Sequence, residues 1–397
     1  MSTSSSCSSS KQKVVDTGNF SFLKGNLPKG CQYCVKGEKL VLFITGLCGM
    51  HCFYCPVSEK KIRKDVIYAN EWKIESVQDL LEEARLTEAK GAGITGGDPL
   101  VVVDRVCDYI RLLKKEFGKD FHIHLYTTLQ LVTEERLQKL YDAGLDEIRF
   151  HFNLDDQSWW PRILLATNTK KYDWDTGAEI PCIPGKKKEI LALIDFLKDK
   201  VQFLNLNELK LSEPNSEEFC RRNLATRNPQ TYAIQGSYEL ALEILNERKD
   251  VPLSLYFCTA KLKDAVQMKN RIARRARNVK ESFDTITKEG TLIRGTIYLK
   301  DLEPSFGYRK KLAEFDAEAR AAYVAQLQTL CKELIERFGF TESTLLVDDL
   351  KLRLIGDLKL LRKHKKALKN LNNLGLIPAR VEEFPTRDAI ELEIDYL

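Results

Sequence analysis

From Lys39 onward, short apolar runs alternate with longer amphipathic stretches. This alternation is typical of repeated βα units, which build a parallel sheet covered by helices. The apolar runs predict strands at 40–45, 93–95, 122–127, 147–153, 179–183 and 203–209, with a further candidate at 253–257. Apolar positions at helical spacing predict helices between them, among others at 77–89, 104–117, 133–143 and 187–198.

These units predict an α/β fold class, a partial (β/α)6 TIM-like barrel that stays open. If the strands are parallel and the crossovers right-handed, all strands end on one face, and the loops there build the site. Beyond residue 286 the alternation loosens, which predicts a smaller C-terminal α+β region. Its predicted elements are strands at 292–298 and 345–354, helices at 316–338 and 357–371, and a final segment at 389–396.

The length of 397 residues fits one barrel-sized domain with a smaller appendage. We expect a disordered Ser-rich tail over 1–20, a Cys-containing lead-in over 21–38, the barrel over 39–285 and a C-terminal α+β domain over 286–397. The tail lacks the apolar run of a secretory signal, and no stretch approaches the length of a membrane span. We therefore expect a soluble cytoplasmic protein, in which cysteines stay reduced. The eleven cysteines then indicate metal ligation and not disulfides.

The net charge of +5 is mild, but basic residues concentrate in two C-terminal stretches. Basic helix faces are usually solvated surface, and the alternative is a face that binds RNA or an acidic partner. The stretches are Arg271, Arg274, Arg275, Arg277 and Lys280, and then Arg362, Lys363, Lys365, Lys366 and Lys369.

Three closely spaced cysteines, Cys48, Cys52 and Cys55, follow the first predicted strand on a glycine-containing loop. Three thiolates at this spacing can hold three corners of a cubane iron–sulfur cluster and leave the fourth iron without a protein ligand. The alternatives are a zinc knuckle or buried free thiols. Zinc sites usually supply four ligands as paired clusters, and His51 is awkwardly placed beside Cys52, so the spacing favours the cluster.

The cysteine loop resembles that of the radical S-adenosylmethionine (SAM) superfamily, which reads C-x-x-x-C-x-x-C with an aromatic residue, here Tyr54, before the last cysteine. The resemblance implies a [4Fe–4S] cluster whose open iron is chelated by the amino and carboxylate groups of SAM. It also implies that the reduced cluster cleaves SAM to methionine and a 5′-deoxyadenosyl radical. Tyr54 is then expected to pack near the adenine.

A second motif, Gly96, Gly97, Asp98 and Pro99, ends the second predicted strand. Two glycines let the backbone approach a ligand closely, and a carboxylate beside them can receive an ammonium group. The motif resembles the G-G-E-P element of the superfamily, which holds the SAM amino group. Asp98 stands where that element has Glu, and its side chain is shorter by one methylene.

The resemblance also implies that Thr127, Arg149, His151 and Ile183 line the cofactor pocket from later strand ends; the alternative for each is a packing or surface role. The pattern departs from the family around Ile183, where Pro181 and Lys188 occupy its first and last positions. The next strand carries three polar residues, which are either substrate contacts or a hydrogen-bonded barrel interior. They are Asn205, Asn207 and Glu208.

Cys31 and Cys34 form a C-x-x-C pair before the first strand, and Cys258 follows the apolar run 253–257. We hypothesise a second metal site on these three cysteines, an auxiliary iron–sulfur cluster or zinc, with an unidentified fourth ligand. Parallel strands would place Cys34 and Cys258 at opposite ends of the sheet. The lead-in must therefore fold back along the first strand for the three thiols to meet.

Within the superfamily, the chain resembles relatives of pyruvate formate-lyase activating enzyme. The resemblance lies in the C-x-x-C pair of the lead-in and in the segments 41–46 and 264–267. It implies a radical SAM enzyme that takes electrons from a donor such as ferredoxin or flavodoxin and abstracts hydrogen from RNA, a peptide or a small molecule. A glycyl-radical-enzyme activase is the alternative within the family, and we favour a modifying enzyme over it. A non-catalytic metal-binding or RNA-binding module is the alternative of another class.

Overall fold

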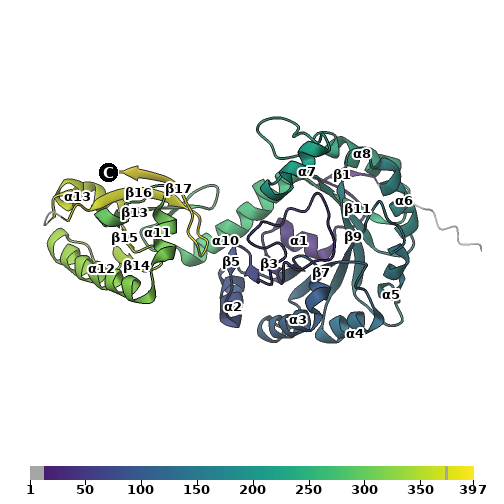
Figure 1. Cartoon of the computed structure of the whole chain (residues 1–397), viewed down its shortest axis with the longest axis horizontal. Helices are drawn as coiled ribbons and strands as arrows, with labels where there is room; N and C mark the ends of the chain where they lie inside the picture. The colour runs from purple at the N-terminus through teal and green to yellow at the C-terminus, as the bar shows by residue number, and fades with distance from the viewer. Residues whose placement is uncertain (1–12, 372–373) are drawn as a thin grey trace, which may run out of the picture. The chain divides into compact units, whose positions relative to one another are not determined.

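The computed structural model describes residues 13–371 and 374–397 and separates two units, Met1–Arg271 and Ile272–Leu397 (Figure 1). The main sheet of the first unit contains a run of parallel strands whose spatial order follows the chain. These strands are β3 (Lys39–Phe43), β6 (Gly91–Thr95), β7 (His122–Thr128), β8 (Glu147–His151), β9 (Asp175–Cys182), β10 (Phe203–Glu208) and β11 (Ser254–Cys258).

Short strands end this sheet on both sides, and the two edges do not pair with each other in the described part of the chain. One edge carries β4 (Tyr68–Ala69) and β5 (Trp72–Lys73), and the other carries β2 (Ser21–Lys24) and β1 (Val15–Asp16). The predicted partial barrel is therefore confirmed, and the candidate strand at 253–257 is present as β11. Figure 1 shows the sheet curving around a short helix, α1 (Lys29–Val35).

Helices cover the outer face of the sheet because each buries one apolar stripe against it. In α3, for example, Val106, Ile110 and Leu113 are fully buried in the core. A capping box at Ser76 and Asp79 fixes the start of α2. The helices are α2 (Val77–Leu86), α3 (Val103–Phe117), α4 (Glu134–Ala143), α5 (Ile163–Ala166), α6 (Lys187–Leu197), α7 (Ser216–Arg221) and α8 (Ser237–Glu247).

The lead-in differs from the expectation in two ways. Of the disordered tail expected over 1–20, residues 1–12 lie outside the described residues. Residues 15 and 16 form strand β1, so the expected tail extends too far along the chain. Phe22 lies in β2, the strand that pairs with β1. Its ring stacks on that of Phe257 in β11, with ring centroids 6.3 Å apart, and this contact anchors the edge of the sheet. The C-x-x-C pair lies within α1, which the sequence analysis did not predict.

After β11 the chain returns toward the beginning of β3. It passes through α9 (Ala260–Leu262), a π-helical turn (Lys263–Met268) and α10 (Lys269–Val279). Asn270 donates its side-chain amide to the carbonyl of Val35, 2.8 Å away, at the end of α1. The division between the two units falls inside α10, whereas the sequence analysis placed the domain boundary at 286.

The second unit is an antiparallel sheet in the order β14-β15-β13-β16-β17, with β12 paired to β13. The single strand predicted at 345–354 is wrong, because the chain turns at Leu352 with φ of 50° and makes a hairpin. The strand at 377–383 was missed because Pro378 and charged residues interrupt its apolar pattern. The elements are β12 (Thr285–Ile286), β13 (Leu292–Tyr298), α11 (Tyr308–Glu314), α12 (Ala317–Phe338), β14 (Leu345–Asp348), β15 (Arg353–Gly356), α13 (Leu358–Lys369), β16 (Ile377–Glu383) and β17 (Glu391–Tyr396).

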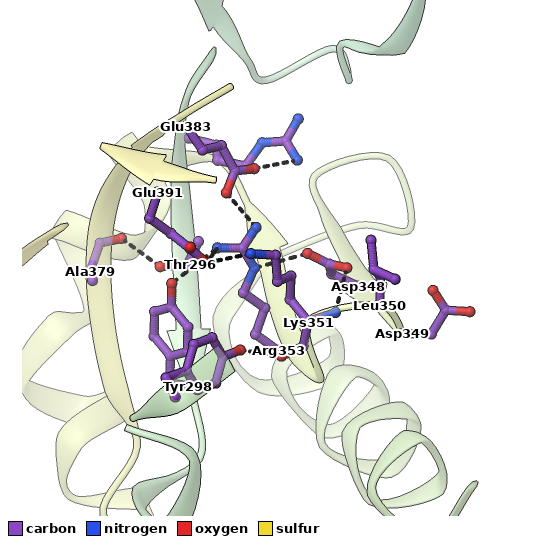
Figure 2. Close-up of polar contacts among 12 residues, drawn as sticks. Thr296, Tyr298, Asp348, Asp349, Leu350, Lys351, Arg353, Ala379, Glu383 and Glu391 are labelled. Carbon is purple, nitrogen blue, oxygen red and sulfur yellow. Dashed lines mark hydrogen bonds and ion pairs between the residues drawn. The ribbon is translucent and has the colours of Figure 1, made fainter. Parts of the chain in front are cut away.

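A buried ion-pair network ties the central strands of the second unit together (Figure 2). Arg353, with 0% of its surface exposed, bonds through its guanidinium to Asp348 at 2.9 Å and Glu383 at 2.6 Å. Its third contact is the hydroxyl of Tyr298, 3.0 Å away. Because every member has a partner, the network is a structural feature of the sheet.

No helix among the described residues combines the length and the apolar character that a membrane crossing needs.

Candidate active site

The loop between β3 and β4 carries Cys48, Cys52 and Cys55, all half-buried and not joined in disulfides. Backbone hydrogen bonds fix its base, since the Gly46 N–H donates to the Lys64 carbonyl at 2.8 Å. A further turn is closed from the Cys55 N–H to the Cys52 carbonyl at 3.0 Å. Burial raises the pKa of the Cys48 and Cys52 thiols. The loop thus presents three soft ligands between one backbone hydrogen bond at its base and one turn at Cys52–Cys55.

The Gly96 and Gly97 turn lies directly against this loop. The Gly97 N–H donates to the Thr45 carbonyl at 2.8 Å, and the Asp98 N–H donates to the Leu47 carbonyl at the same distance. A Cβ at Gly97 would lie 2.3 Å from the Leu47 oxygen, and one at Gly96 would lie 2.3 Å from the Thr45 oxygen. Only glycines permit this approach. The structure therefore brings the two sequence motifs together.

Asp98 is buried, and its carboxylate is occupied by protein donors. It accepts hydrogen bonds from the hydroxyl groups of Thr127 at 2.7 Å and Thr128 at 2.6 Å. It also accepts the Leu100 N–H at 3.0 Å and caps the turn that Pro99 begins. The side chain therefore holds the ends of β6 and β7 in register and is not left free for an ammonium group.

Tyr54 is joined to β8 through His151, whose Nε2 lies 2.8 Å from the tyrosine hydroxyl. Nδ1 of His151 lies 3.1 Å from the Glu179 carbonyl on β9. Burial lowers the pKa of His151 and raises that of Tyr54, so both are neutral near pH 7. His51, in contrast, is exposed and lies 3.3 Å from the Arg63 guanidinium. These two predicted site residues, Tyr54 and His151, are in direct contact.

Arg149 and Ile183 are both buried in the barrel. The guanidinium of Arg149 is buried and bonds to Glu147, to Glu179 at 3.0 Å and to the Tyr126 hydroxyl at 3.1 Å. Ile183 packs in the main hydrophobic core. The family resemblance implied that Arg149 lines the cofactor pocket; its partners on neighbouring strands could not be predicted from the sequence.

A cavity of about 80 Å³ lies inside the barrel beside Arg149. Its lining combines the three cysteines predicted for a second site with cationic, carboxylate, amide and phenol groups. Cys31, Cys34, Lys39, Tyr126, Arg149, Glu179, Asn205, Asn207, Tyr256, Cys258, Lys263 and Gln267 line it. The geometric objection raised by the sequence is resolved, because α1 folds inside the barrel.

Glu179, which sequence reasoning missed as a site residue, lies at the centre of the hydrogen bonds in this cavity. Burial acts to raise the pKa of its carboxyl, but the Arg149 and Lys263 cations and the amides of Asn205 and Asn207 lower it to about 2. The two amides lie 3.0 and 2.8 Å from its oxygens. The only sequence signal for Glu179 was its place as a charged residue within a predicted strand. Asn205 and Asn207 thus make interior hydrogen bonds.

Glu208, the third polar residue of the strand, bonds to Arg227 at 2.8 Å and accepts the Ala260 N–H at 2.8 Å. It therefore fixes the beginning of the segment that returns after β11. Across the described ranges, no three His, Cys, Asp or Glu side chains are close enough to hold a single metal ion. A cubane separates its cysteine ligands more widely than one ion does, so this finding leaves both cysteine sets open to a cluster.

Residues 42–200 match the family described as the radical SAM superfamily. The chain is 44% identical over 311 residues to a candidate glycyl-radical enzyme activating enzyme of Methanocaldococcus jannaschii, covering 77% of this chain and 81% of the relative. It is 25% identical over 184 residues to a candidate GTP 3′,8-cyclase of Methanococcus maripaludis, covering 44% of this chain and 59% of that one.

Two solved structures show lower similarity. Methylornithine synthase aligns with a TM-score of 0.37 at 13% identity, over 52% of this chain and 62% of the other. The [FeFe]-hydrogenase maturase HydG aligns with a TM-score of 0.36 at 12% identity, over 86% of this chain and 80% of the other.

Proposed function

The chain belongs to the radical SAM superfamily, and from that premise we propose that Cys48, Cys52 and Cys55 hold its [4Fe–4S] cluster. The protein is an enzyme that uses this cluster type and SAM as cofactors. When bound, the cluster supplies the electron that cleaves SAM to methionine and the 5′-deoxyadenosyl radical, which abstracts hydrogen from substrate. The support is the loop between β3 and β4, which carries three half-buried free thiols and is closed at its base by a backbone hydrogen bond. Thiolates are the ligands such clusters require.

The cofactor pocket follows from the groups around that loop. We assign the SAM ammonium group to backbone atoms of Gly96 and Gly97, because the Asp98 carboxylate is filled by Thr127, Thr128 and the Leu100 N–H. Tyr54 and His151 form the wall toward β8, and Pro99 and Ile183 contribute apolar surface. Arg149 is left out of the pocket, since its guanidinium is held by carboxylates in the interior cavity.

The substrate class divides into two proposals. An activase that makes a glycyl radical on a protein partner is favoured by the name of the 44% identical relative. An enzyme that modifies a peptide, a small molecule or RNA is favoured by the interior cavity, whose lining of three thiols offers a second functional group inside the barrel. Both need a one-electron reductant, for which we propose a ferredoxin or a flavodoxin.

The assignment is tested by anaerobic reconstitution with iron and sulfide. The wild type should gain the broad iron–sulfur absorption and release 5′-deoxyadenosine from SAM and dithionite. Cys52→Ala should lose the nucleoside product. Cys220→Ala, at an exposed cysteine on α7, is the matched control and should behave as wild type. Persistence of 5′-deoxyadenosine in Cys52→Ala contradicts the assignment.

The two substrate classes separate by spectroscopy. Incubation of the reduced enzyme and SAM with an anaerobic lysate should, for an activase, produce an organic radical signal on a lysate protein. That signal must be absent with Cys52→Ala. A modifying enzyme gives 5′-deoxyadenosine turnover with no lasting protein radical.

A further inference from the structure

We propose that Cys31, Cys34 and Cys258 hold a second iron–sulfur cluster, of the [4Fe–4S] type, inside the barrel. The three sulfurs belong to two segments far apart in the chain, yet they line one cavity of about 80 Å³. Cys31 and Cys258 are buried, and Cys34 is half-buried. This site is separate from the cysteine loop between β3 and β4 and does not depend on it.

The fold brings these cysteines together through α1. The helix packs on the inward side of β3, β6 and β7. Its Gly30 makes this approach possible, because a Cβ there would lie 2.6 Å from His124 Nδ1 and 2.7 Å from Arg149 Nη2. The Gly30 N–H donates to Glu147 at 3.2 Å and fixes the helix start. The C-x-x-C pair is thereby held inside the barrel, at the cavity.

The third cysteine arrives from the opposite edge of the parallel run. Cys258 is the last residue of β11, and the π-helical turn that follows places Lys263 and Gln267 on the same cavity. Asn270 then ties this segment to the end of α1 through the Val35 carbonyl. The open side of the barrel is therefore spanned by the two segments that carry the thiols.

Side-chain amides donate to two of the sulfurs. Nδ2 of Asn205 lies 3.3 Å from Cys31 Sγ, and Nε2 of Gln267 lies 3.8 Å from Cys258 Sγ. Hydrogen bonds to cysteine sulfur are a means by which proteins tune iron–sulfur clusters. Asn205 is 2% exposed, and its Oδ1 has no hydrogen-bond partner among the described residues. A buried amide oxygen left unpaired at a cavity points to an occupant.

The charge of the lining also calls for an anionic occupant. Three cations, Lys39, Arg149 and Lys263, line the cavity with one carboxylate, Glu179, and a second carboxylate, Glu147, pairs with Arg149 from outside the lining. Within the described ranges, neither Lys39 nor Lys263 has an ion-pair partner. Both lysines are half-buried, and a cation partly removed from water is stabilised by a nearby anion. Three thiolates around a [4Fe–4S]²⁺ core carry one net negative charge and would offset this excess.

A cluster fits the donor set better than zinc. Structural zinc takes four close ligands, and the cavity lining supplies three cysteines without a histidine. The described residues contain no group tight enough for a single ion. Three cysteine ligands on a cubane leave one iron for a ligand from outside the cysteine set, as in the site between β3 and β4.

The test is to count iron and sulfide in a variant that lacks the first site. Cys48→Ala/Cys52→Ala/Cys55→Ala, reconstituted anaerobically, should retain about four iron and four sulfide per chain, against about eight of each in the wild type. Its dithionite-reduced EPR signal should be unchanged by SAM. Cys31→Ala/Cys34→Ala and Cys258→Ala should each fall to about four iron while still binding SAM. Cys182→Ala, at a core cysteine outside the cavity, is the control and keeps the wild-type content.

Wild-type protein with about four iron and a triple variant with none would overturn this inference and leave the proposed function intact. A wild type with about four iron, all retained in the triple variant, would instead overturn the proposed function. If a variant unfolds by circular dichroism, Mössbauer spectra of wild-type protein decide, since two clusters with different environments give two sets of quadrupole doublets. A single set at about four iron per chain contradicts the second site.

Discussion

The hydroxyl of Tyr54 lies 2.8 Å from Nε2 of His151 and joins the cysteine loop to the barrel wall. The direction of this bond follows from the other ring nitrogen. Nδ1 of His151 faces the Glu179 carbonyl, which can only accept, so Nδ1 carries the proton of the neutral ring. Nε2 is then the acceptor and the tyrosine O–H donates. The loop is held by a bond that requires a neutral histidine.

Tyr54→Phe removes this bond and keeps the ring. We expect a three- to tenfold weaker SAM affinity, because losing one buried hydrogen bond costs about 1 kcal/mol. Iron content should not change, since Cys52 and Cys55 keep their backbone turn. Isothermal titration of the reconstituted protein measures the affinity, and Tyr232→Phe, at a tyrosine 64% exposed, is the control. Equal affinities in wild type and Tyr54→Phe would show that the bond does not position the cofactor wall.

Gly97→Ala should impair cluster assembly between β3 and β4. Its Cβ would lie 2.3 Å from the Leu47 carbonyl and 2.9 Å from Cys48 Cβ, so the cysteine loop must move. Gly49→Ala lies in the same loop, but its Cβ would meet only Gln130, at 3.6 Å, an ordinary contact. We expect Gly49→Ala to keep wild-type iron content and Gly97→Ala to lose at least half of the SAM-responsive iron signal. Equal losses in both variants contradict this account of the close approach.

Asp98→Ala should destabilise the first unit by about 3 kcal/mol, because it leaves the donors of Thr127, Thr128 and Leu100 unpaired in the interior. Asp98→Glu, which restores the residue of the G-G-E-P element, should cost about 1 to 3 kcal/mol, since a longer side chain must fit at a buried position where three donors fix the carboxylate. Urea unfolding followed by tryptophan fluorescence gives these values. Asp104→Ala, at an exposed carboxylate paired with Lys139, should change stability by less than about 1 kcal/mol. If Asp98→Ala leaves the free energy of unfolding unchanged, the carboxylate serves to bind a ligand and does not stabilise the fold.

The barrel and the cysteine loop could be predicted because both are recorded locally. A parallel strand buried on both faces is a continuous apolar run, and a cluster loop needs its three cysteines at fixed spacing. The lead-in was harder, because the short helix α1 has Gly30 inside it and is stabilised by contacts with His124 and Arg149, far along the chain. The sequence contained the cysteine pair but not the reason for its position.

Partners across strands could not be predicted at all. Arg149 resembled a cofactor ligand, but Glu147 and Glu179 hold it, and this depends on which inward-facing positions become neighbours in the parallel register. Likewise, β16 was missed because Pro378 and Glu383 obscure an apolar strand. Glu383 is buried only because Arg353 and Arg294 neutralise it from adjacent strands. Such residues are explained by tertiary pairing and not by local propensity.

Acidification should destabilise the protein through His124. Burial, then the cations Arg149 and Lys39, lower its pKa well below 6.5. Above pH 6.5 the ring is neutral in the folded and unfolded chain, so it adds no pH dependence. Below that value the unfolded chain takes up a proton that the folded chain does not, and stability falls by about 1.4 kcal/mol per pH unit. The measurement is the difference between the urea midpoints at pH 7.5 and pH 5.5. This difference should be smaller in His124→Gln than in wild type. The control is His51→Gln, at an exposed histidine, which should show the wild-type difference. An unchanged difference in His124→Gln contradicts this origin.

Arg353→Met should cost the second unit about 3 to 5 kcal/mol, because it leaves the buried carboxylate of Glu383 and the half-buried one of Asp348 without their main counter-ion (Figure 2). Arg353→Lys keeps the charge but not the planar fork, so it should recover only part of this loss. Arg380→Met removes pairs with the exposed Glu393 and Asp395 and should cost less than about 1 kcal/mol.

The measurement must report on the second unit alone. All four tryptophans of the chain lie before residue 175, so tryptophan fluorescence follows only the first unit. Amide hydrogen exchange in β13, β15 and β16 measures the second, and protection there should fall in Arg353→Met while the fluorescence transition stays at the wild-type midpoint. Replacing both partners of a buried ion pair by apolar residues can leave stability unchanged. Arg353→Met is destabilising because it removes the positive charge and leaves the negative charges behind. Unchanged exchange in that variant would mean that Arg294 is a sufficient counter-ion for Glu383 and that the Lys351 N–H is a sufficient partner for Asp348, and the network would then be redundant at Arg353.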